Sequence, residues 1–371
     1  MVHRRILAAA ASAALALSLA ACGDDDSGSG GTASGGGSTG SSTGGAQAEG
    51  KVGVILPDTE SSARWETADR PLLAQAFEEA GIEYDIQNAE GDAQRMQTIA
   101  DQMITGGVTV LAIVNLDSAS GAQIQSTAQQ QGVLTIDYDR LTLGGSAEYY
   151  VSFDNVEVGR LQGQGLQQCL GEGPKNIAYL NGSPDDNNAT LFSQGAHEVL
   201  DAVQDYTVVA EQAVPGWDNQ QAATIFEQMY TEAGGQIDGV LAANDGLGNA
   251  AISILARNQA AGEVPVTGQD ATVEGLQNIL AGNQCMTVYK PIAEEANALA
   301  ELAIGLINGE EASGTEEVED PEGGRQVPSV LLDPVAVFRD NVKDVVDDGF
   351  VTAADLCTGE FAADCTELGI Q

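Results

Sequence analysis

Apolar runs alternate with amphipathic segments along most of the chain. Apolar residues recur at helical spacing in 72–80, 96–104 and 222–229, and a second set of strand–helix units begins at Asn176. Such alternation predicts a mainly parallel sheet covered by helices on both faces. The acidic, glycine-containing stretch 309–324 breaks the pattern, and we expect it to be a surface loop ahead of an apolar run and a last helix. We therefore predict an α/β fold with two Rossmann-like lobes, for which 371 residues are sufficient.

The chain carries a strong negative charge. Its formal net charge is −41, and removal of Arg4 and Arg5 with a cleaved leader makes it more negative by two charges. A field of this sign repels phosphate backbones and anionic lipid heads, which excludes nucleic acid as an expected partner. A neutral ligand is indifferent to the charge, and the charge also suits an exported protein that has to stay soluble.

The first 50 residues are typical of an exported and anchored protein. Residues 1–21 have a basic start and then an apolar stretch too short for a stable transmembrane helix, which predicts a signal peptide. Cys22 ends a Leu-Ala-Ala-Cys sequence that resembles the bacterial lipobox, so we expect a lipid on Cys22 and attachment to the outer face of the cell membrane. The rest of 22–50 is rich in Gly, Ser and Thr and predicts a flexible linker with a reach of roughly 30 Å. The alternative is an ordinary signal peptide followed by an incidental cysteine.

Polar and aromatic side chains follow six apolar runs at the point where each run ends. The runs and their followers are 51–56 with Arg64 and Trp65, 133–138 with Asp139 and Arg140, 176–181 with Asp186, Asn187 and Asn188, 237–243 with Asn244 and Asp245, 264–268 with Gln269 and Asp270, and 286–289 with Lys290. Ligands of open α/β sheets bind outside the carboxyl ends of parallel strands, so these groups should converge. Charged side chains give strong hydrogen bonds to hydroxyl groups, which predicts a cleft for a polyhydroxylated ligand. Taken singly, the same Asp and Asn residues are ordinary turn formers and helix caps, and the Arg and Lys residues suit surface ion pairs or a hinge.

Two tryptophans, Trp65 and Trp217, stand in polar segments rather than in apolar stripes. An indole ring offers a large, rigid apolar surface that matches the C–H face of a pyranose. We therefore expect both rings to enclose a sugar. The alternative is that each ring only covers the edge of a core.

Patterns of catalytic and metal sites are weak. Beyond Lys51 the sequence has no Gly-x-Ser-x-Gly elbow and no Gly-x-x-x-x-Gly-Lys loop, and His197 is the single histidine beyond the leader. Residues 246–251 match a loose dinucleotide fingerprint, but glycines there more simply open a helix capped by Asp245. Two carboxylates such as Asp139 and Asp186 can in principle hydrolyse glycosides. We expect no enzyme activity, no cofactor and no metal ion.

Four cysteines lie beyond Cys22. Cys357 and Cys365 are close in sequence, which predicts a local disulfide in an oxidising compartment. Cys169 and Cys285 are candidates for a second bridge, from a helix end to a strand start. The sequence does not fix the distance between them, so this bridge stays open.

Seven short segments resemble those of the periplasmic D-xylose-binding proteins of bacterial ABC importers. They are Arg64-Trp65, 137–140, 152–155, 182–189, 243–245, 268–271 and 286–291, and the likeness covers about 51–354 in order. That family belongs to the pentose- and hexose-binding group that shares the ribose-binding fold. The resemblance implies a type I periplasmic binding protein, in which two lobes with parallel sheets are joined by a three-segment hinge.

The resemblance also implies the site. Sugar hydrogen bonds would come from Arg64, Asp139, Arg140, Asp186, Asn188, Asn244, Asp270 and Lys290, with Trp65 and Trp217 enclosing the ring. We expect crossings near Ser152, Pro291 and Leu332, which give an N-terminal lobe of 51–152 plus 291–330 and a C-terminal lobe of 153–290 plus 331–371. A sugar that contacts both lobes favours the closed form. The closed form would then be presented to an ABC permease.

Other classes of protein share parts of this pattern. A sugar-responsive transcription regulator has this fold, but it needs a helix-turn-helix segment ahead of Lys51 and a basic surface. A sugar-modifying enzyme would turn over a bound aldose, whereas a carrier returns it intact. A sensor that acts through a membrane signalling receptor remains an alternative. The choice among D-xylose, arabinose, ribose and glucose also stays open, because cleft shape decides it.

Overall fold

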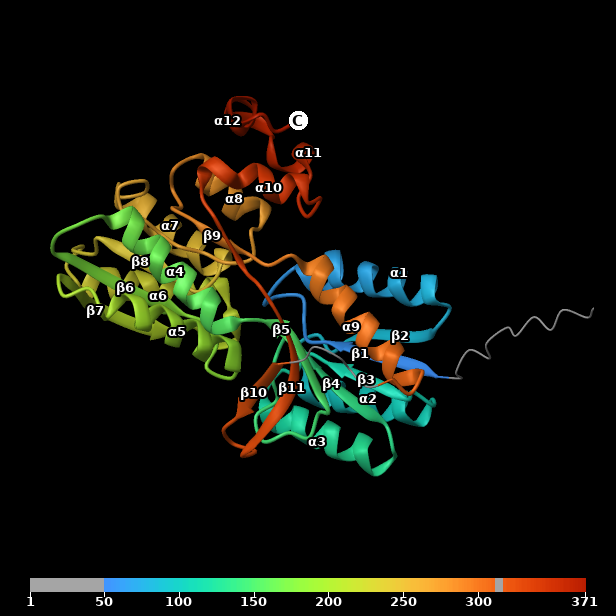
Figure 1. Ribbon diagram of the computed structural model, residues 1–371. Coiled ribbons are helices and arrows are strands. Elements are labelled where there is room, and N and C mark those ends of the chain that lie inside the picture. Colours follow the sequence, from blue (N-terminus) through green and yellow to red (C-terminus); the bar gives the residue numbers. More distant parts are fainter. Residues whose placement is uncertain (1–49, 311–315) are drawn as a thin grey trace, which may run out of the picture. The chain divides into compact units, whose positions relative to one another are not determined.

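Two main sheets, of seven and three strands, carry the fold of the described residues, and a third sheet has only two strands (Figure 1). The computed structural model describes residues 50–310 and 316–371, so the expected signal peptide, Cys22 and the linker up to residue 49 lie outside the described residues. Helices cover both faces of each main sheet, and most strands are parallel. This confirms the predicted α/β fold with two lobes.

The first lobe contains a seven-stranded sheet in the order β10-β11-β5-β4-β3-β1-β2. Its strands are β1 (Lys51–Leu56), β2 (Glu83–Asn88), β3 (Val110–Ile113), β4 (Leu134–Tyr138), β5 (Tyr149–Phe153), β10 (Glu316–Asp320) and β11 (Arg325–Leu332). All neighbours are parallel except β10 and β11. The prediction of a surface loop over 309–324 is therefore wrong for β10. This strand lies at the sheet edge with mostly exposed side chains, where acidic residues are tolerated and also deter pairing with other chains.

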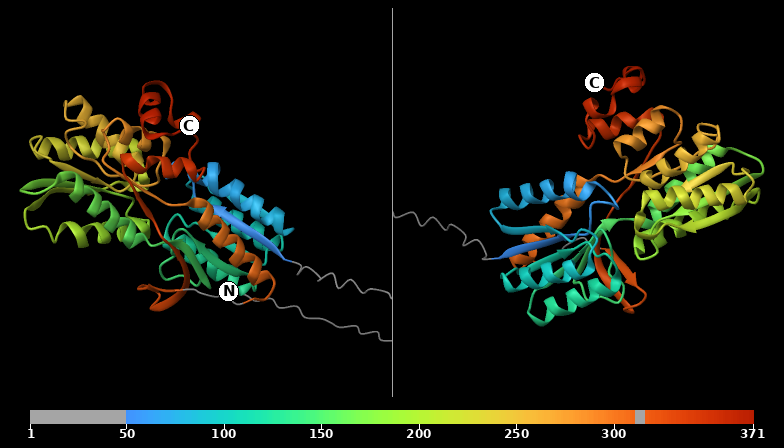
Figure 2. Two further views of the ribbon diagram at one scale, coloured as in Figure 1. Left: turned by 45° about the horizontal axis from the view of Figure 1, so that its top comes forward. Right: turned by 180° about the vertical axis from the view of Figure 1, so that it is seen from behind.

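Helices of the first lobe lie on opposite faces of its sheet (Figure 2). They are the π-helix η1 (Trp65–Asp69), α1 (Arg70–Ala80), α2 (Ala93–Thr105), α3 (Ser118–Gln130) and α9 (Ile292–Ile307). Apolar residues of α1 and α9 pack on one face, and those of α2 and α3 pack on the other. The helical spacing in 72–80 and 96–104 is confirmed by α1 and α2.

The second lobe is built around β6, with β7 and β8 as its neighbours. Its strands are β6 (Lys175–Asn181), β7 (Tyr206–Ala213), β8 (Gly239–Ala242), β9 (Thr287–Tyr289) and β12 (Val335–Val337). The antiparallel pair β9–β12 joins this core through single bridges, Val240 to Val266 and Gln269 to Val288. The apolar run 264–268 thus contributes bridges rather than the regular strand that its composition suggested.

Helices sandwich the second sheet as well. They are α4 (Asn155–Leu170), α5 (Asn187–Leu200), the short η2 (Pro215–Trp217), α6 (Asn219–Glu232), α7 (Asp245–Arg257) and α8 (Val273–Leu280). Leucines of α4 and α5 pack against one face of β6, whereas α6 and α7 cover the other face. The spacing in 222–229 is confirmed by α6.

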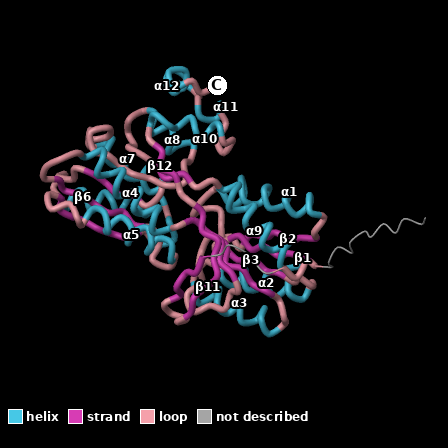
Figure 3. The backbone as a smooth tube through the Cα atoms, in the orientation of Figure 1, coloured by secondary structure: helices cyan, strands magenta, loops and turns pink. Residues whose placement is uncertain are grey.

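Short helices form the C-terminal end of the chain, next to α8 (Figure 3). They are η3 (Arg339–Asn341), α10 (Val342–Asp347), α11 (Ala353–Leu356), η4 (Gly359–Phe361) and α12 (Ala362–Leu368). The single last helix predicted from the sequence is wrong, because Gly349 and Gly359 take positive φ angles of 81° and 58° and interrupt it. Among the described helices, none is long and apolar enough to cross a membrane.

The chain passes from one lobe to the other three times. The crossings follow β5, lie between β9 and α9, and lie between β11 and β12. Leu332 of β11 pairs with Phe153 of β5, so the first sheet extends slightly past the expected limits at residues 152 and 330. The three connections place the carboxyl ends of β1, β4, β6, β8 and β9 around one region, where the site lies.

Candidate functional site

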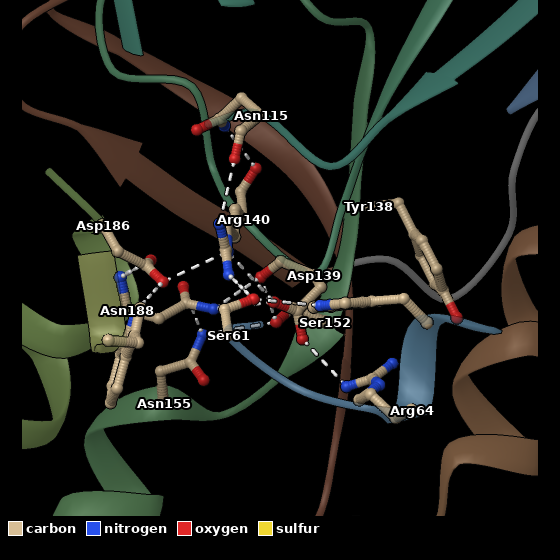
Figure 4. Close-up of polar contacts among 12 residues, drawn as sticks. Ser61, Arg64, Asn115, Tyr138, Asp139, Arg140, Ser152, Asn155, Asp186 and Asn188 are labelled. Carbon is tan, nitrogen blue, oxygen red and sulfur yellow. Dashed lines mark hydrogen bonds and ion pairs between the residues drawn. The ribbon is translucent and has the colours of Figure 1, made fainter. Parts of the chain in front are cut away.

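A cavity between the lobes is lined by residues of both. All ten residues that the sequence singled out lie along it: Arg64, Trp65, Asp139, Arg140, Asp186, Asn188, Trp217, Asn244, Asp270 and Lys290. The structure therefore brings together side chains from segments more than two hundred residues apart. Their polar contacts, drawn in Figure 4, hold several of them in place.

Arg64 lies on the first-lobe wall among three carboxylates. Its Nη1 donates to Asp139 at 3.1 Å, its Nε and Nη2 donate to Asp69 at 2.9 and 2.7 Å, and Nη2 also donates to Glu295. Burial alone lowers the pKa of Arg64, but the charges of Asp69 and Glu295 outweigh burial and raise that pKa well above its ordinary value. Arg64 is therefore a permanent cation in the cavity wall.

Asp139 stands where the two lobes meet. Its φ angle is 60°, a left-handed conformation that Asp and Asn adopt more readily than most residues. Its main-chain oxygen accepts hydrogen bonds from Tyr150, Ser152 and Asn188, which hold the backbone there. Burial raises the pKa of Asp139, but the charges of Lys290, Arg64 and Arg140 outweigh burial and lower it. Asp139 therefore remains an acceptor.

Arg140 connects the first-lobe wall to the second lobe (Figure 4). Its Nε lies 3.1 Å from Asp186, and its Nη1 and Nη2 donate to the Asn115 main-chain oxygen and to Ser61 at 3.2 Å each. Burial raises the pKa of Asp186, and the Arg140 charge counteracts only part of that effect. Arg140 and Asp186 thus bring opposite charges together across the cavity.

Asp186 and Asn188 enter the cavity from the start of α5. Asp186 is the N-cap of this helix and accepts a hydrogen bond from the Asn188 N–H at 2.9 Å. The Asn188 amide donates to Asp139 and accepts from Asn155. The predicted alternative, that these residues are helix caps, is therefore true of Asp186, which nevertheless lines the cavity.

Asn244, rather than Asp245, caps α7. Its Oδ1 accepts from the Leu247 N–H at 2.9 Å. The prediction that Asp245 is the cap is wrong, because Asp245 is the first helical residue and its buried carboxylate accepts from Thr272, Gln284 and Thr287 instead. A Cβ on Gly246 or Gly248 would meet protein atoms, so these glycines serve close packing within the protein.

Asp270 and Lys290 form an ion pair at 3.3 Å on the second-lobe side. Asp270 and the next residue, Ala271, have φ angles of 92° and 47°, a conformation that costs energy for residues with a side chain. The Asp270 N–H donates to the Val288 main-chain oxygen at 2.8 Å. The neighbouring strand β9 therefore fixes the turn that presents the carboxylate.

Both tryptophans are buried rather than in open loops. Trp65 begins the π-helix η1 and belongs to the core under α1 and α9, and Trp217 ends the helix η2 and belongs to the core under α6 and α7. Their Nε1 atoms donate to Ser61 and to Asp186, each at 3.1 Å. Each ring therefore packs on a core, as the alternative expected, and also lines the cavity.

Several residues of the site were missed by the sequence reasoning. Ser61, Ser62 and Phe192 also line the cavity, and Asp69 and Glu295 hold Arg64 from behind. Gln269 also lines the cavity; it was expected to converge with the other polar residues that follow apolar runs, but it was not among the implied sugar ligands. Phe192 and Glu295 lie within helices, where apolar or acidic residues carry no local signal of a site.

Two disulfides are present among residues 50–310 and 316–371. Cys357 and Cys365 are joined within the C-terminal short helices, with Cα atoms 5.8 Å apart. Cys169 at the end of α4 is joined to Cys285 just ahead of β9, with Cα atoms 6.5 Å apart. The second bridge ties a helix to the strand that leads into Lys290.

Comparison with known proteins gives the family. The model of the periplasmic binding protein domain matches residues 52–311. The chain belongs to this family. Its members are periplasmic or other extracytoplasmic solute-binding proteins of transporters and not enzymes. The hypotheses of a dinucleotide-binding enzyme and of a glycoside hydrolase are therefore rejected.

Two relatives and one solved structure illustrate the likeness. The D-xylose-binding periplasmic protein of Escherichia coli is 36% identical over 312 residues, 83% of this chain and 93% of that protein. The multiple sugar-binding periplasmic receptor ChvE of Rhizobium radiobacter is 32% identical, over 84% of this chain and 93% of that protein. An ABC transporter solute-binding protein from Clostridium phytofermentans with bound β-D-glucose has a TM-score of 0.76 and 29% identity, over 82% of this chain and 99% of that one. The family resemblance expected from seven segments is confirmed.

Proposed function

We propose that this protein captures a monosaccharide outside the cytoplasm, with D-xylose as the first candidate, and delivers it to an ABC permease. The observation that carries the proposal is the single cavity along which ten polar and aromatic residues of both lobes converge. The relatives named for D-xylose or for several sugars support the choice of ligand.

Chemistry of the cavity suits a neutral sugar. Arg64, Arg140 and Lys290 offer charged donors, whereas Asp139 and Asp270 offer charged acceptors. Sugar hydroxyls both donate and accept, so they can pair with both kinds of group. Trp65 and Trp217 add apolar ring faces for the C–H groups of the sugar.

Closure of the two lobes over the sugar is the proposed mechanism. Arg140 and Asp186 come from different lobes, as do Asp139 and Asn188, and both pairs are in contact. A sugar that adds contacts to both lobes stabilises the closed arrangement, because a ligand shifts such an equilibrium only by its differential affinity. The chain segments around residues 153, 290 and 333 would act as the hinge.

Tryptophan fluorescence tests the proposal. The chain has only two tryptophans and both line the cavity, so a true ligand should change the emission strongly. The purified protein is titrated with D-xylose, L-arabinose, D-ribose, D-glucose and D-galactose, and isothermal titration calorimetry gives each Kd. Absence of binding to every aldose in the panel would refute the function.

Replacement of Asp270 tests the site itself. Asp270→Ala removes the partner of Lys290 and a charged acceptor, so we expect sugar binding to weaken by about 2 kcal/mol or more. Calorimetry on the variant and on the wild type measures the change. An unaltered Kd would remove Asp270 from the site.

A second candidate function is a sugar sensor that acts through a membrane signalling receptor. The relative ChvE, whose name describes it as a receptor, favours this alternative. Sugar uptake by cells that lack the protein separates the two roles. A carrier is required for uptake, whereas a sensor is required only for the transcriptional response to the sugar.

Anchoring through Cys22 is a further part of the proposal and rests on the sequence alone. Cys22→Ser removes the thiol that would receive the lipid. The protein should then leave the membrane fraction and appear in the soluble extracytoplasmic fraction, as seen by immunoblotting. Retention of the variant in the membrane fraction would contradict lipidation at this residue.

A further inference from the structure

Two of the carboxylates around Arg64 do not line the cavity. Asp69 and Glu295 have fully buried side chains, and neither is among the residues along the cavity wall. Asp69 accepts from both Nε and Nη2 of Arg64, and Glu295 accepts a second hydrogen bond from Nη2. Both carboxylates therefore act on Arg64 from behind the wall.

The hydrogen bonds of Arg64 leave little freedom for a ligand. A guanidinium has five N–H donors in a fixed plane. Asp69 takes two of them, Glu295 takes one and Asp139 takes one. A single N–H, on Nη1, remains without a protein acceptor in the described part of the chain.

Glu295 is the less constrained of the two supports. Asp69 also accepts from the Tyr138 hydroxyl at 2.6 Å, so it belongs to a wider network. Glu295 contacts Arg64 through Oε2, and its buried Oε1 has no hydrogen-bond partner among the described residues. Glu295 lies in the first turn of α9, shortly after Lys290 and the second crossing between the lobes.

We propose that Glu295 is a positioning residue of the site: it accepts the second N–H of Arg64 Nη2 and thereby fixes the guanidinium so that one N–H alone is offered to the ligand. The identity of the ligand as a sugar rests on the proposed function above. The position of the guanidinium does not, since it follows from the contacts of Arg64. The Arg64 plane is held further by the Trp65 ring, whose centroid lies 4.4 Å from Cζ.

The protonation of Glu295 shapes the choice of variants. Burial raises the pKa of Glu295, the Arg64 charge counteracts part of the rise, and the result is about 8. The role needs an accepting oxygen at this position, which the ionised and the protonated carboxyl group both have. Glu295→Gln keeps an accepting oxygen and can turn its amide toward the unpartnered side, whereas Glu295→Leu removes the acceptor. Glu301→Leu makes the same change at an exposed position of the same helix.

Two measurements test the proposal. Calorimetry gives the Kd of wild type, Glu295→Leu, Glu295→Gln and Glu301→Leu for the sugar that the wild type binds best. ¹⁵N NMR of arginine side chains, with Arg64 assigned by Arg64→Lys, follows rotation of the guanidinium in the sugar-free protein.

We expect Glu295→Leu to weaken binding by about tenfold or more, because a buried N–H is left unsatisfied, and Glu295→Gln to stay within about threefold of wild type. The Nη signals of Arg64 should be resolved in the wild type and in Glu295→Gln, and averaged in Glu295→Leu. Glu301→Leu should match the wild type in both measurements.

Three results would overturn the role. They are wild-type affinity in Glu295→Leu, equal losses in both Glu295 variants with unchanged Arg64 signals, and averaged Arg64 signals in the wild type. If Glu295→Leu does not fold, the wild type and Glu295→Gln still test the proposal. In both proteins, added sugar should shift the signal of one Arg64 Nη1 proton and not the signals of several Arg64 protons. If no aldose binds, the proposed function is wrong. The NMR spectra of the sugar-free wild type and variants still test whether Glu295 fixes the Arg64 guanidinium.

Discussion

The two walls of the cavity hold their side chains by different means. On the first-lobe wall, Arg64 is held by Asp69, five residues away in the sequence, and by Asp139 and Glu295, which lie 75 and 231 residues away. On the second-lobe wall, Asp186 and Asn244 are N-caps that accept from main-chain N–H groups two and three residues further on. The first wall therefore depends on charge pairing, part of it long-range, and the second depends on local helix geometry.

Because of this difference, we expect substitutions in the two walls to differ in their effects on ligand affinity and on protein stability. A change in a long-range ion pair disturbs the placement of a charged donor but leaves each helix and strand intact. A change in a cap weakens the helix as well as the site, since an unsatisfied helix start costs about 1 kcal/mol. Variants of the first wall should therefore affect affinity more than stability, and variants of the second wall should affect both.

Asp139→Asn gives the largest expected effect. Asn tolerates the left-handed backbone at this position, so the backbone should be kept while the change removes the charge and turns one of the two oxygens that accept from Arg64 and Asn188 into a donor. The contact with Arg64 at 3.1 Å becomes a neutral one, and we expect sugar binding to weaken by about 2 to 3 kcal/mol. Calorimetry measures the loss, and a thermal melt measures stability. Asp92→Asn, at an exposed cap elsewhere, is the control, and a loss of stability in Asp139→Asn without a loss of affinity would reverse the comparison.

Buried carboxylates behind the two walls should respond to pH alike. Burial raises the pKa of Asp245 from 3.8 to about 7, although Gln284 and Thr272 counteract part of the rise through hydrogen bonds. The folded state then keeps a proton that the unfolded state loses, so stability falls as the pH rises from about 4 to about 7, by up to about 1.4 kcal/mol per pH unit. Asp245→Asn should flatten this fall.

The measurement is the free energy of unfolding in urea at several pH values across that window. Asp137, behind the first wall, is the matched case, because burial raises its pKa to about 7 as well, against hydrogen bonds from Thr142. Asp137→Asn should flatten the fall to a similar degree. An unchanged slope in either variant would show that its carboxyl titrates normally in the folded protein.

The sequence was sufficient for the fold and for most of the cavity lining. Strand ends in an α/β sheet converge whatever the details of packing, so polar residues at those ends could be assigned to one site before the structure was known. Asp186 and Asn244 were recognisable both as caps and as candidate ligand residues, because both roles use the same local position.

Residues that act through other residues could not be predicted in this way. Glu295 is one acidic residue in the first turn of a helix, a common place for Glu, and only the chain path brings it to Arg64. Phe192 likewise occupies a position on α5 that any core residue could fill. The edge strand β10 was missed because its acidic side chains face solvent, so no apolar alternation marked it.

Asn244→Ala has the smallest expected effect on stability and is the sharpest test of the second wall. The variant loses the hydrogen bond from the Leu247 N–H at 2.9 Å, which should lower the free energy of unfolding by about 1 kcal/mol. It also loses an amide in the cavity, so sugar binding should weaken. Asn244→Ser restores a capping oxygen but not the amide. We expect it to recover most of the stability while its affinity stays as low as that of Asn244→Ala.

Asp92→Ala provides the control for this last comparison. It removes the cap of α2, which accepts from Gln94 and Arg95, at a position outside the cavity. Its stability should fall by a similar amount with no change in Kd. If Asn244→Ser recovered affinity together with stability, Asn244 would act on the ligand only by holding α7, and the second wall would contain one sugar-binding side chain fewer.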